Sequence, residues 1–291
     1  MSATLQPARP PAPASLDALA PVEVARKAED VGMAKAGMSA ANTFALGVLA
    51  GAFIAMGAIF ATTVTAGGAT MPYGVSRLLA GLTFSLGLIL VVVAGAELFT
   101  GNNLIVMAWA SRRVSTMRLL RNWALVYVGN FTGAIATVGL LLVAKQYTFG
   151  KGAIGEQAIA IATGKVNLGW TQAIALGAFC NALVCLAVWL AYSARTTADK
   201  ILAIVPPIAA FVAAGFEHSV ANMFFIPMAL LIKTDHAFVA SHTMPATGMG
   251  HLTWTHFLLA NLIPVTIGNI IGGALMVGAV YWFVYLRPAK H

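Results

Sequence analysis

The chain has 291 residues, of which 59% are hydrophobic and only 9% are charged. Soluble domains contain about 25% charged residues, so this composition excludes an ordinary soluble protein and predicts an all-α membrane protein. The net charge of +8 does not indicate nucleic-acid binding, because the basic residues are scattered between apolar runs without a basic stripe or interleaved aromatic residues.

The N-terminal part is unlike the rest of the chain. Residues 1–20 are rich in Pro and Ala and lack the apolar core of a signal peptide, so they are predicted to be a disordered tail. Residues 21–40 predict a weakly amphipathic helix on the cytoplasmic membrane surface, with a longer disordered tail as the alternative.

Six apolar segments follow, and a membrane-spanning helix needs about 20 residues. They are 43–66, 77–110, 119–144, 170–194, 200–233 and 254–286. Together they predict a transmembrane domain over 41–287, followed by a short tail at 288–291. The second and fifth segments exceed 30 residues and contain polar clusters at their middles, so each is predicted to be two half-helices joined by unwound backbone.

Basic residues between the segments predict the orientation. Twelve lie on one side: Arg9, Arg26, Lys27, Lys35, Arg112, Arg113, Arg118, Arg121, Arg195, Lys200, Arg287 and Lys290. Five lie on the other: Arg77, Lys145, Lys151, Lys165 and Lys233. Because basic loops stay in the cytoplasm, both termini are predicted to be cytoplasmic.

The chain contains an internal repeat. "GAELFTGN" (95–102) matches "GFEHSVAN" (215–222), and "NWALVYVGNFTGA" (122–134) matches "NLIPVTIGNIIGGA" (261–274). "GAF" recurs at 51–53 and 177–179, so the first three segments correspond to the last three. Because each unit has three membrane crossings, an odd number, the second copy must run through the membrane in the opposite direction. This predicts an inverted 3+3 repeat with halves at about 41–145 and 165–287, and a substrate path at the membrane midplane.

Polar side chains at the two predicted breaks are the candidate site. Glu97 and Glu217 are intramembrane carboxylates, interpreted as accepting backbone N–H bonds at the breaks, with proton or ion handling as the alternative. His218 occurs in only one half, where it could change its protonation state as a substrate passes, and Thr100 on the other break is its expected hydrogen-bonding partner.

The sequence gives no support for an enzyme or a metalloprotein. GxSxG, HExxH, Walker A and GxGxxG motifs are missing, and the other histidines have no metal-ligand spacing, so no metal or cofactor is predicted. Cys180 and Cys185 lie in one apolar run and are interpreted as packing residues. An intramembrane enzyme using Glu217 and His218 as an acid/base pair is a remote alternative without a nucleophile.

Four motifs resemble the formate/nitrite transporter family, and especially its formate channel branch. They are "AELFTGNNLIV" (96–106), "NALVCLAVWLAYSAR" (181–195), "GFEHSVANMFFIPM" (215–228) and "NLIPVTIGNIIGGAL" (261–275). The resemblance covers about residues 22–287. It implies an aquaporin-like protomer with spans 2 and 5 broken, a pore in each protomer, and a homopentamer in the bacterial cytoplasmic membrane.

The resemblance also implies roles for individual residues. Thr100 and His218 would face each other at the pore centre. Apolar gates would be formed by Phe84, Leu88, Phe99, Val184 and Phe211. Asn181, Asn222 and Ser219 would be polar pore residues, and Lys165 would draw anions toward Glu217.

These features together predict a channel for small monovalent anions. Formate is the expected substrate, with protons as a second partner if His218 protonates the anion. Nitrite and hydrosulfide are the alternatives within the family, because the chain departs from the common pattern at Gly101, Asn102 and Asn103.

Overall fold

The computed structural model describes residues 17–68 and 71–288, and these residues form helices without any strand. Most of the predicted 1–20 tail and residues 289–291 lie outside the described ranges. The elements of the first half are α1 (Pro21–Gly37), α2 (Ala40–Thr65), α3 (Tyr73–Ile89), η1 (Leu90–Gly95), η2 (Gly101–Ile105), α4 (Val106–Ala110), α5 (Thr116–Val143) and η3 (Gln146–Thr148).

The remaining elements follow in the second half. Its elements are α6 (Ala153–Val166), α7 (Trp170–Ser193), α8 (Thr197–Ala213), α9 (Ser219–Ile232), α10 (His236–Ser241), η4 (Met249–His251), η5 (His256–Leu262), α11 (Ile263–Ile270), η6 (Ile271–Ala279) and α12 (Val280–Tyr285). Both predicted interruptions are present, because helical structure stops after Gly95 and after Ala213 and resumes at Gly101 and Ser219.

Five helical stretches among the described residues are long and apolar enough to cross a membrane. They are Ala40–Thr65, Tyr73–Gly95, Thr116–Val143, Trp170–Ser193 and His256–Tyr285. The predicted fifth span, 200–233, does not form one long helix, because the break divides it into α8 of 17 residues and α9 of 14 residues. The chain is therefore a multi-pass membrane protein.

One helix is present where it was predicted and one was not predicted. Residues 21–37 form helix α1, which packs with buried Val24, Ala25 and Ala28 against η2, α4 and α7. Helix α6 falls in a region predicted to be a connection. Its buried Ala158, Ile159 and Ala162 recur at helical spacing and pack against α9.

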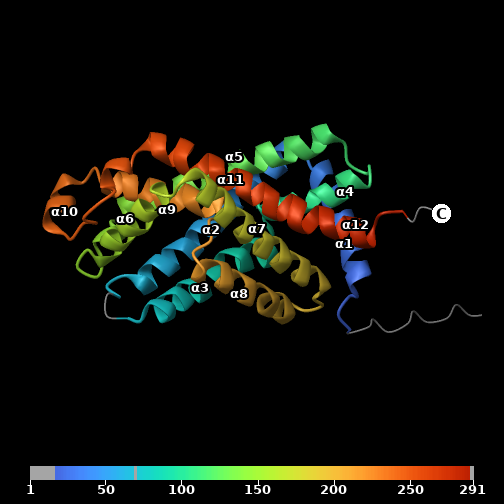
Figure 1. Cartoon of the computed structure of the whole chain (residues 1–291), viewed down its shortest axis with the longest axis horizontal. Helices are drawn as coiled ribbons and strands as arrows, with labels where there is room; N and C mark the ends of the chain where they lie inside the picture. The colour runs from blue at the N-terminus through green and yellow to red at the C-terminus, as the bar shows by residue number, and fades with distance from the viewer. Residues whose placement is uncertain (1–16, 69–70, 289–291) are drawn as a thin grey trace, which may run out of the picture.

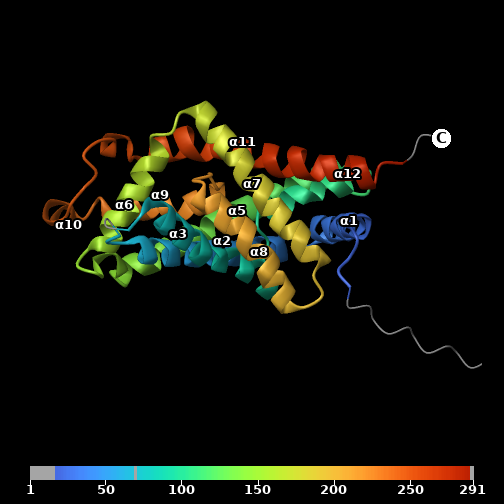
Figure 2. The ribbon, with the colours of Figure 1, turned by 60° about the horizontal axis from the view of Figure 1, so that its bottom comes forward.

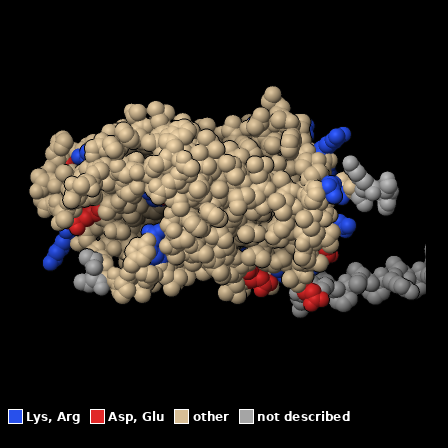
Figure 3. Space-filling model, viewed as in Figure 1, with Lys and Arg blue, Asp and Glu red and all other residues tan. Residues whose placement is uncertain are grey.

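The molecule is elongated, and on one face its charged side chains lie mostly toward the two ends (Figures 1 and 3). Figures 1 and 2 place α1 and α12 at one end and α6 and α10 at the other. On the face drawn in Figure 3 the basic and acidic side chains cluster toward these ends, while the broad middle is almost free of charge and includes a hollow with a basic side chain beside it. This distribution suits a bilayer around the middle of the molecule.

Candidate functional site

The two helix breaks meet inside the protein. Thr100 Oγ1 lies 2.9 Å from His218 Nε2, and both residues are buried. The predicted contact between these side chains is therefore present, although they are separated by more than a hundred residues in the chain.

A glycine in the left-handed region ends the helix before each break. Gly95 has φ +87° and Gly215 has φ +78°. The next residue then turns back onto the helix, since Ala96 N–H donates to Val91 O and Phe216 N–H donates to Phe211 O. This is the hydrogen-bonding pattern in which helices commonly terminate at glycine, and it explains the Gly-x-Glu spacing in both motifs.

Asn130 fixes the first break from helix α5. Its Nδ2 donates to Gly47 O at 2.8 Å and to Glu97 O at 2.9 Å, and its Oδ1 accepts from Phe99 N–H at 2.9 Å. Unwound backbone inside a membrane needs such partners, because no water replaces them.

Asn269 does the same for the second break. Its Nδ2 donates to Gly177 O and Glu217 O, both at 2.9 Å, and its Oδ1 accepts from Ser219 N–H at 2.9 Å. Both asparagines occupy the Gly-Asn position of the sequence repeat, which could have identified them, although the sequence analysis assigned them no role.

Among residues 17–68 and 71–288, no backbone N–H donates to either glutamate side chain at the breaks, so that interpretation was wrong. Glu97 Oε1 accepts from Lys35 Nζ at 2.8 Å, and its Oε2 accepts from Asn102 Nδ2 at 2.6 Å. Asn102 Nδ2 also donates to Asn122 Oδ1. The carboxylate is neutralised by an ammonium group, and the backbone groups of the break are left to the asparagines.

The second half has a matching cluster. Glu217 Oε1 accepts from Lys165 Nζ at 2.8 Å, as the resemblance implied for that lysine, and its Oε2 accepts from Asn222 Nδ2 at 2.7 Å. Asn222 Nδ2 also donates to Asn261 Oδ1 at 2.7 Å, and Asn261 Nδ2 donates to Lys165 O. Lys165 comes from the last turn of α6, and its counterpart Lys35, which the sequence did not assign to the site, comes from α1.

The hydrogen bonds of His218 define its neutral tautomer. Nδ1 accepts from Ala221 N–H at 3.0 Å, because His218 is the N-cap of α9. A neutral ring therefore has its proton on Nε2 and donates it to Thr100 Oγ1. The ring also stacks on Phe211, with a centroid distance of 5.9 Å.

Asn181 joins the first break to helix α11 from helix α7. Its Nδ2 donates to Asn269 O at 2.7 Å, to Thr100 O at 3.2 Å and to Asn103 Oδ1 at 3.3 Å. Ser219 Oγ and Asn222 Oδ1, by contrast, are buried and have no hydrogen-bonding partner among the described residues.

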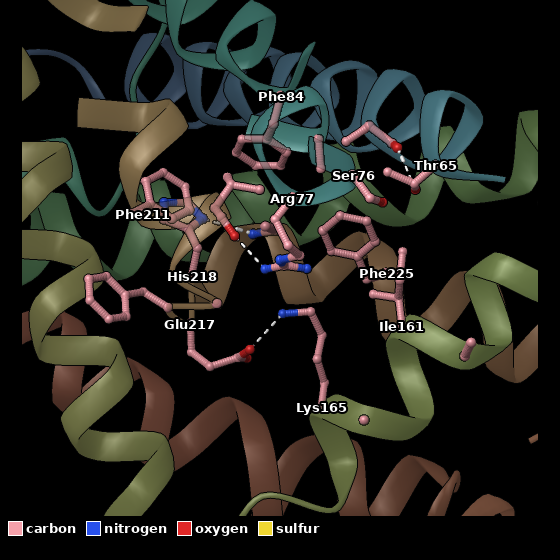
Figure 4. Close-up of a pocket in the computed structure, with 18 of the residues that line it drawn as sticks. Thr65, Ser76, Arg77, Phe84, Ile161, Lys165, Phe211, Glu217, His218 and Phe225 are labelled. Carbon is pink, nitrogen blue, oxygen red and sulfur yellow. Dashed lines mark hydrogen bonds and ion pairs between the residues drawn. The ribbon is translucent and has the colours of Figure 1, made fainter. Parts of the chain in front are cut away.

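Two cavities reach this centre, and each is lined by residues of both halves. The wider, of about 490 Å³, is lined by His218, Glu217, Lys165, Phe84 and Phe211, which Figure 4 shows around its interior. The narrower, of about 290 Å³, is lined by residues including Lys35, Glu97, Leu88, Leu98 and Gly101. Thr100 lies between Leu98 and Gly101, which line the narrower cavity, and it bonds to His218, which lines the wider one, so the Thr100–His218 contact forms a partition between the two.

The predicted gate residues divide into two groups. Phe84 and Phe211 meet edge to face at 5.7 Å in the wider cavity, and Leu88 lines the narrower one. Phe99 and Val184 are buried and line neither cavity.

Phe99 packs instead against Trp123 and Tyr127 of α5, with centroid distances of 6.0 and 4.8 Å. Leu98 was missed as a cavity residue. Its position in the sequence could have indicated this role, because Leu98 is the counterpart of His218 in the sequence repeat.

The comparisons with known proteins decide the family. The model of the formate/nitrite transporter family matches residues 22–283. The chain belongs to the formate/nitrite transporter family. It is 45% identical over 280 residues to the formate channel FocA of Escherichia coli (strain K12), covering 94% of this chain and 97% of the relative.

Further relatives agree. The chain is 41% identical over 266 residues to the formate channel FocA of Haemophilus influenzae, covering 90% of this chain and 93% of the relative. A solved structure titled as a pentameric formate channel with formate bound superposes with a TM-score of 0.80 at 46% identity, covering 85% of this chain and 98% of that one. The chain is thus an anion channel of this family and not an enzyme, which removes the acid/base alternative for Glu217 and His218.

Proposed function

We propose that this protein is a formate channel of the bacterial cytoplasmic membrane. The observation that supports it best is the Thr100–His218 contact between two cavities, in a chain that is 45% identical to a formate channel. A small carboxylate leaving water at this partition would find one N–H donor, on His218, between apolar side chains. Nitrite and hydrosulfide are the competing substrates, and uptake of each anion into proteoliposomes separates them.

The proposed architecture has six crossings, with α8 and α9 together forming the fifth. The matched Lys–Glu–Asn–Asn clusters of the two breaks support an inverted 3+3 repeat, in which the second half runs opposite to the first. Helices α1 and α12 pack against each other, which supports one side of the membrane for both termini, and the bias of basic residues favours the cytoplasmic side. We assign the transmembrane domain to 41–287, with α1 as a cytoplasmic helix before it.

Each protomer is proposed to contain its own pore and to assemble as a homopentamer. The solved relative whose title names a pentamer supports this assembly. Large side chains on the described surface, such as Leu140, Val143 and Leu202, are at least 71% exposed and would contact lipid or neighbouring protomers.

The neutral His218 ring is proposed to donate its Nε2–H to the anion. Full protonation of formate by the ring requires a second proton, which would enter at Nδ1, where Ala221 N–H now donates. A proton-coupled passage therefore requires the N-cap of α9 to release the ring transiently.

Labelled formate uptake with an internal pH dye tests the role of His218. We expect His218→Phe to abolish uptake, since the ring N–H donor is lost, and His218→Gln to retain some uptake without internal acidification, since an amide donates but does not titrate. His256→Phe is the control, because His256 lines neither cavity. Normal uptake and acidification in His218→Phe would refute this role.

A further inference from the structure

Arg77 is a basic residue of the wider cavity that neither the sequence motifs nor the site described above uses. It belongs to the second turn of α3 and lines the cavity together with Lys165, Glu217 and His218. Figure 4 shows Arg77 and Lys165 pointing into the cavity from different walls.

The charges lining this cavity are unequally compensated. Lys165 Nζ lies 2.8 Å from Glu217 Oε1, so this pair contributes little net charge. Arg77 forms no ion pair with any described residue. The uncompensated positive charge of the cavity therefore lies on Arg77 and not on Lys165.

The guanidinium group also holds the end of α8. Arg77 Nε donates to Ala213 O at 3.4 Å, and Nη2 donates to Val212 O. These carbonyls belong to the last turn of α8 before the Gly215 break, and Val212 O also accepts from Gly215 N–H. The partial negative charge of a helix C-terminus, about half an elementary charge, offsets only part of the guanidinium charge.

The guanidinium group of Arg77 has N–H donors available for a ligand. A guanidinium group has five N–H donors in a planar fork, and the carbonyls of Val212 and Ala213 use two of them. The remaining donors have no acceptor among the described residues. A carboxylate matches such a fork better than it matches an ammonium group already bound to another carboxylate.

We propose that Arg77 is the carboxylate-capturing residue of the wider cavity, and that it positions the 214–218 break through Val212 and Ala213. This inference rests on the proposed formate transport. A single uncompensated cation inside a cavity with apolar walls concentrates anions and accelerates their entry. Lys165 then serves mainly to neutralise Glu217 beside His218.

Formate uptake into proteoliposomes, measured over a range of formate and salt concentrations, tests the proposal. We expect Arg77→Gln to raise the half-saturating formate concentration about tenfold and to flatten the salt dependence, because the charge that attracts the anion is lost. Arg77→Lys keeps the charge and should keep the salt dependence. Lys151→Gln is the matched control, since Lys151 is exposed and lines neither cavity.

The outcomes separate the possible failures. Arg77→Gln and Arg77→Lys could both lose maximal flux and thermal stability while the half-saturating formate concentration and the salt dependence stay unchanged. That result would indicate a purely structural role for Arg77 and would overturn its proposed role in capturing the carboxylate. Unchanged uptake in Arg77→Gln at every concentration overturns the whole inference. If the unmodified protein takes up no labelled formate, it is the proposed function that fails.

Discussion

At the scale of single residues, the two breaks depend on asparagines more than on the charged groups that first attract attention. Asn130 and Asn269 each bond to three backbone groups, two of which lie at the break itself. A buried unsatisfied group costs about 1–3 kcal/mol, and the bilayer offers no water in compensation.

Replacing either asparagine by leucine should therefore destabilise the protein strongly. We expect Asn130→Leu and Asn269→Leu each to cost about 3 kcal/mol or more, since three bonds are lost at once. The melting temperature of the purified protein in detergent measures the effect. Thr132→Val is the control on α5, because its exposed hydroxyl bonds only to Val128 O. Melting temperatures equal to that of the control would contradict the role given to the asparagines.

At the scale of the helices, glycines allow the crossings that bring the breaks together. A Cβ at Gly133 would overlap the carbonyl oxygen of Val48 where α5 crosses α2. In the second half, a Cβ at Gly272 would overlap the carbonyl oxygen of Ala178 where η6 crosses α7. Small residues at such crossings let helix backbones approach closely inside a membrane.

Alanine at these crossings should loosen the helix pairs. We expect Gly133→Ala and Gly272→Ala to destabilise the protein by about 1–3 kcal/mol, because the clash is with backbone and cannot be relieved by a rotamer change. Gly139→Ala, also on α5, meets nothing within 4 Å and should be neutral or stabilising by up to about 1 kcal/mol. Thermal unfolding of the three variants in one detergent compares them directly, and equal stability of Gly133→Ala and Gly139→Ala would refute the packing argument.

The sequence predicts the helices and their breaks better than it predicts the hydrogen-bonding and ion-pair partners of individual side chains. Polar clusters within overlong apolar segments indicated both breaks, and the Gly-Asn repeat marked Asn130 and Asn269 without revealing their bonds. Helix α6 was missed because its apolar face is short and lies in a stretch with three glycines nearby, Gly150, Gly152 and Gly155. Lys35 was missed because its partner Glu97 depends on how α1 docks, which local patterns do not determine.

At the scale of the whole molecule, the proposed inverted repeat has a consequence for topology. Six crossings place residues before α2 and after α12 on the same side of the membrane, whereas the five long helices alone would place them on opposite sides. The charge bias of the connections favours the cytoplasm for both ends.

Single cysteines at exposed positions distinguish these topologies. We expect Arg26→Cys and Arg287→Cys to react with a membrane-impermeant maleimide only after the cells are permeabilised, and Lys151→Cys to react in intact cells, because α6 would begin on the outer side. The native Cys180 and Cys185 are fully buried, so the unmodified protein serves as the unlabelled control. Labelling of Arg26→Cys and Arg287→Cys from opposite sides would remove the sixth crossing. The second half could then no longer be the inverted copy of the first, and the matching clusters at Glu97 and Glu217 would not be related by a two-fold axis in the membrane plane.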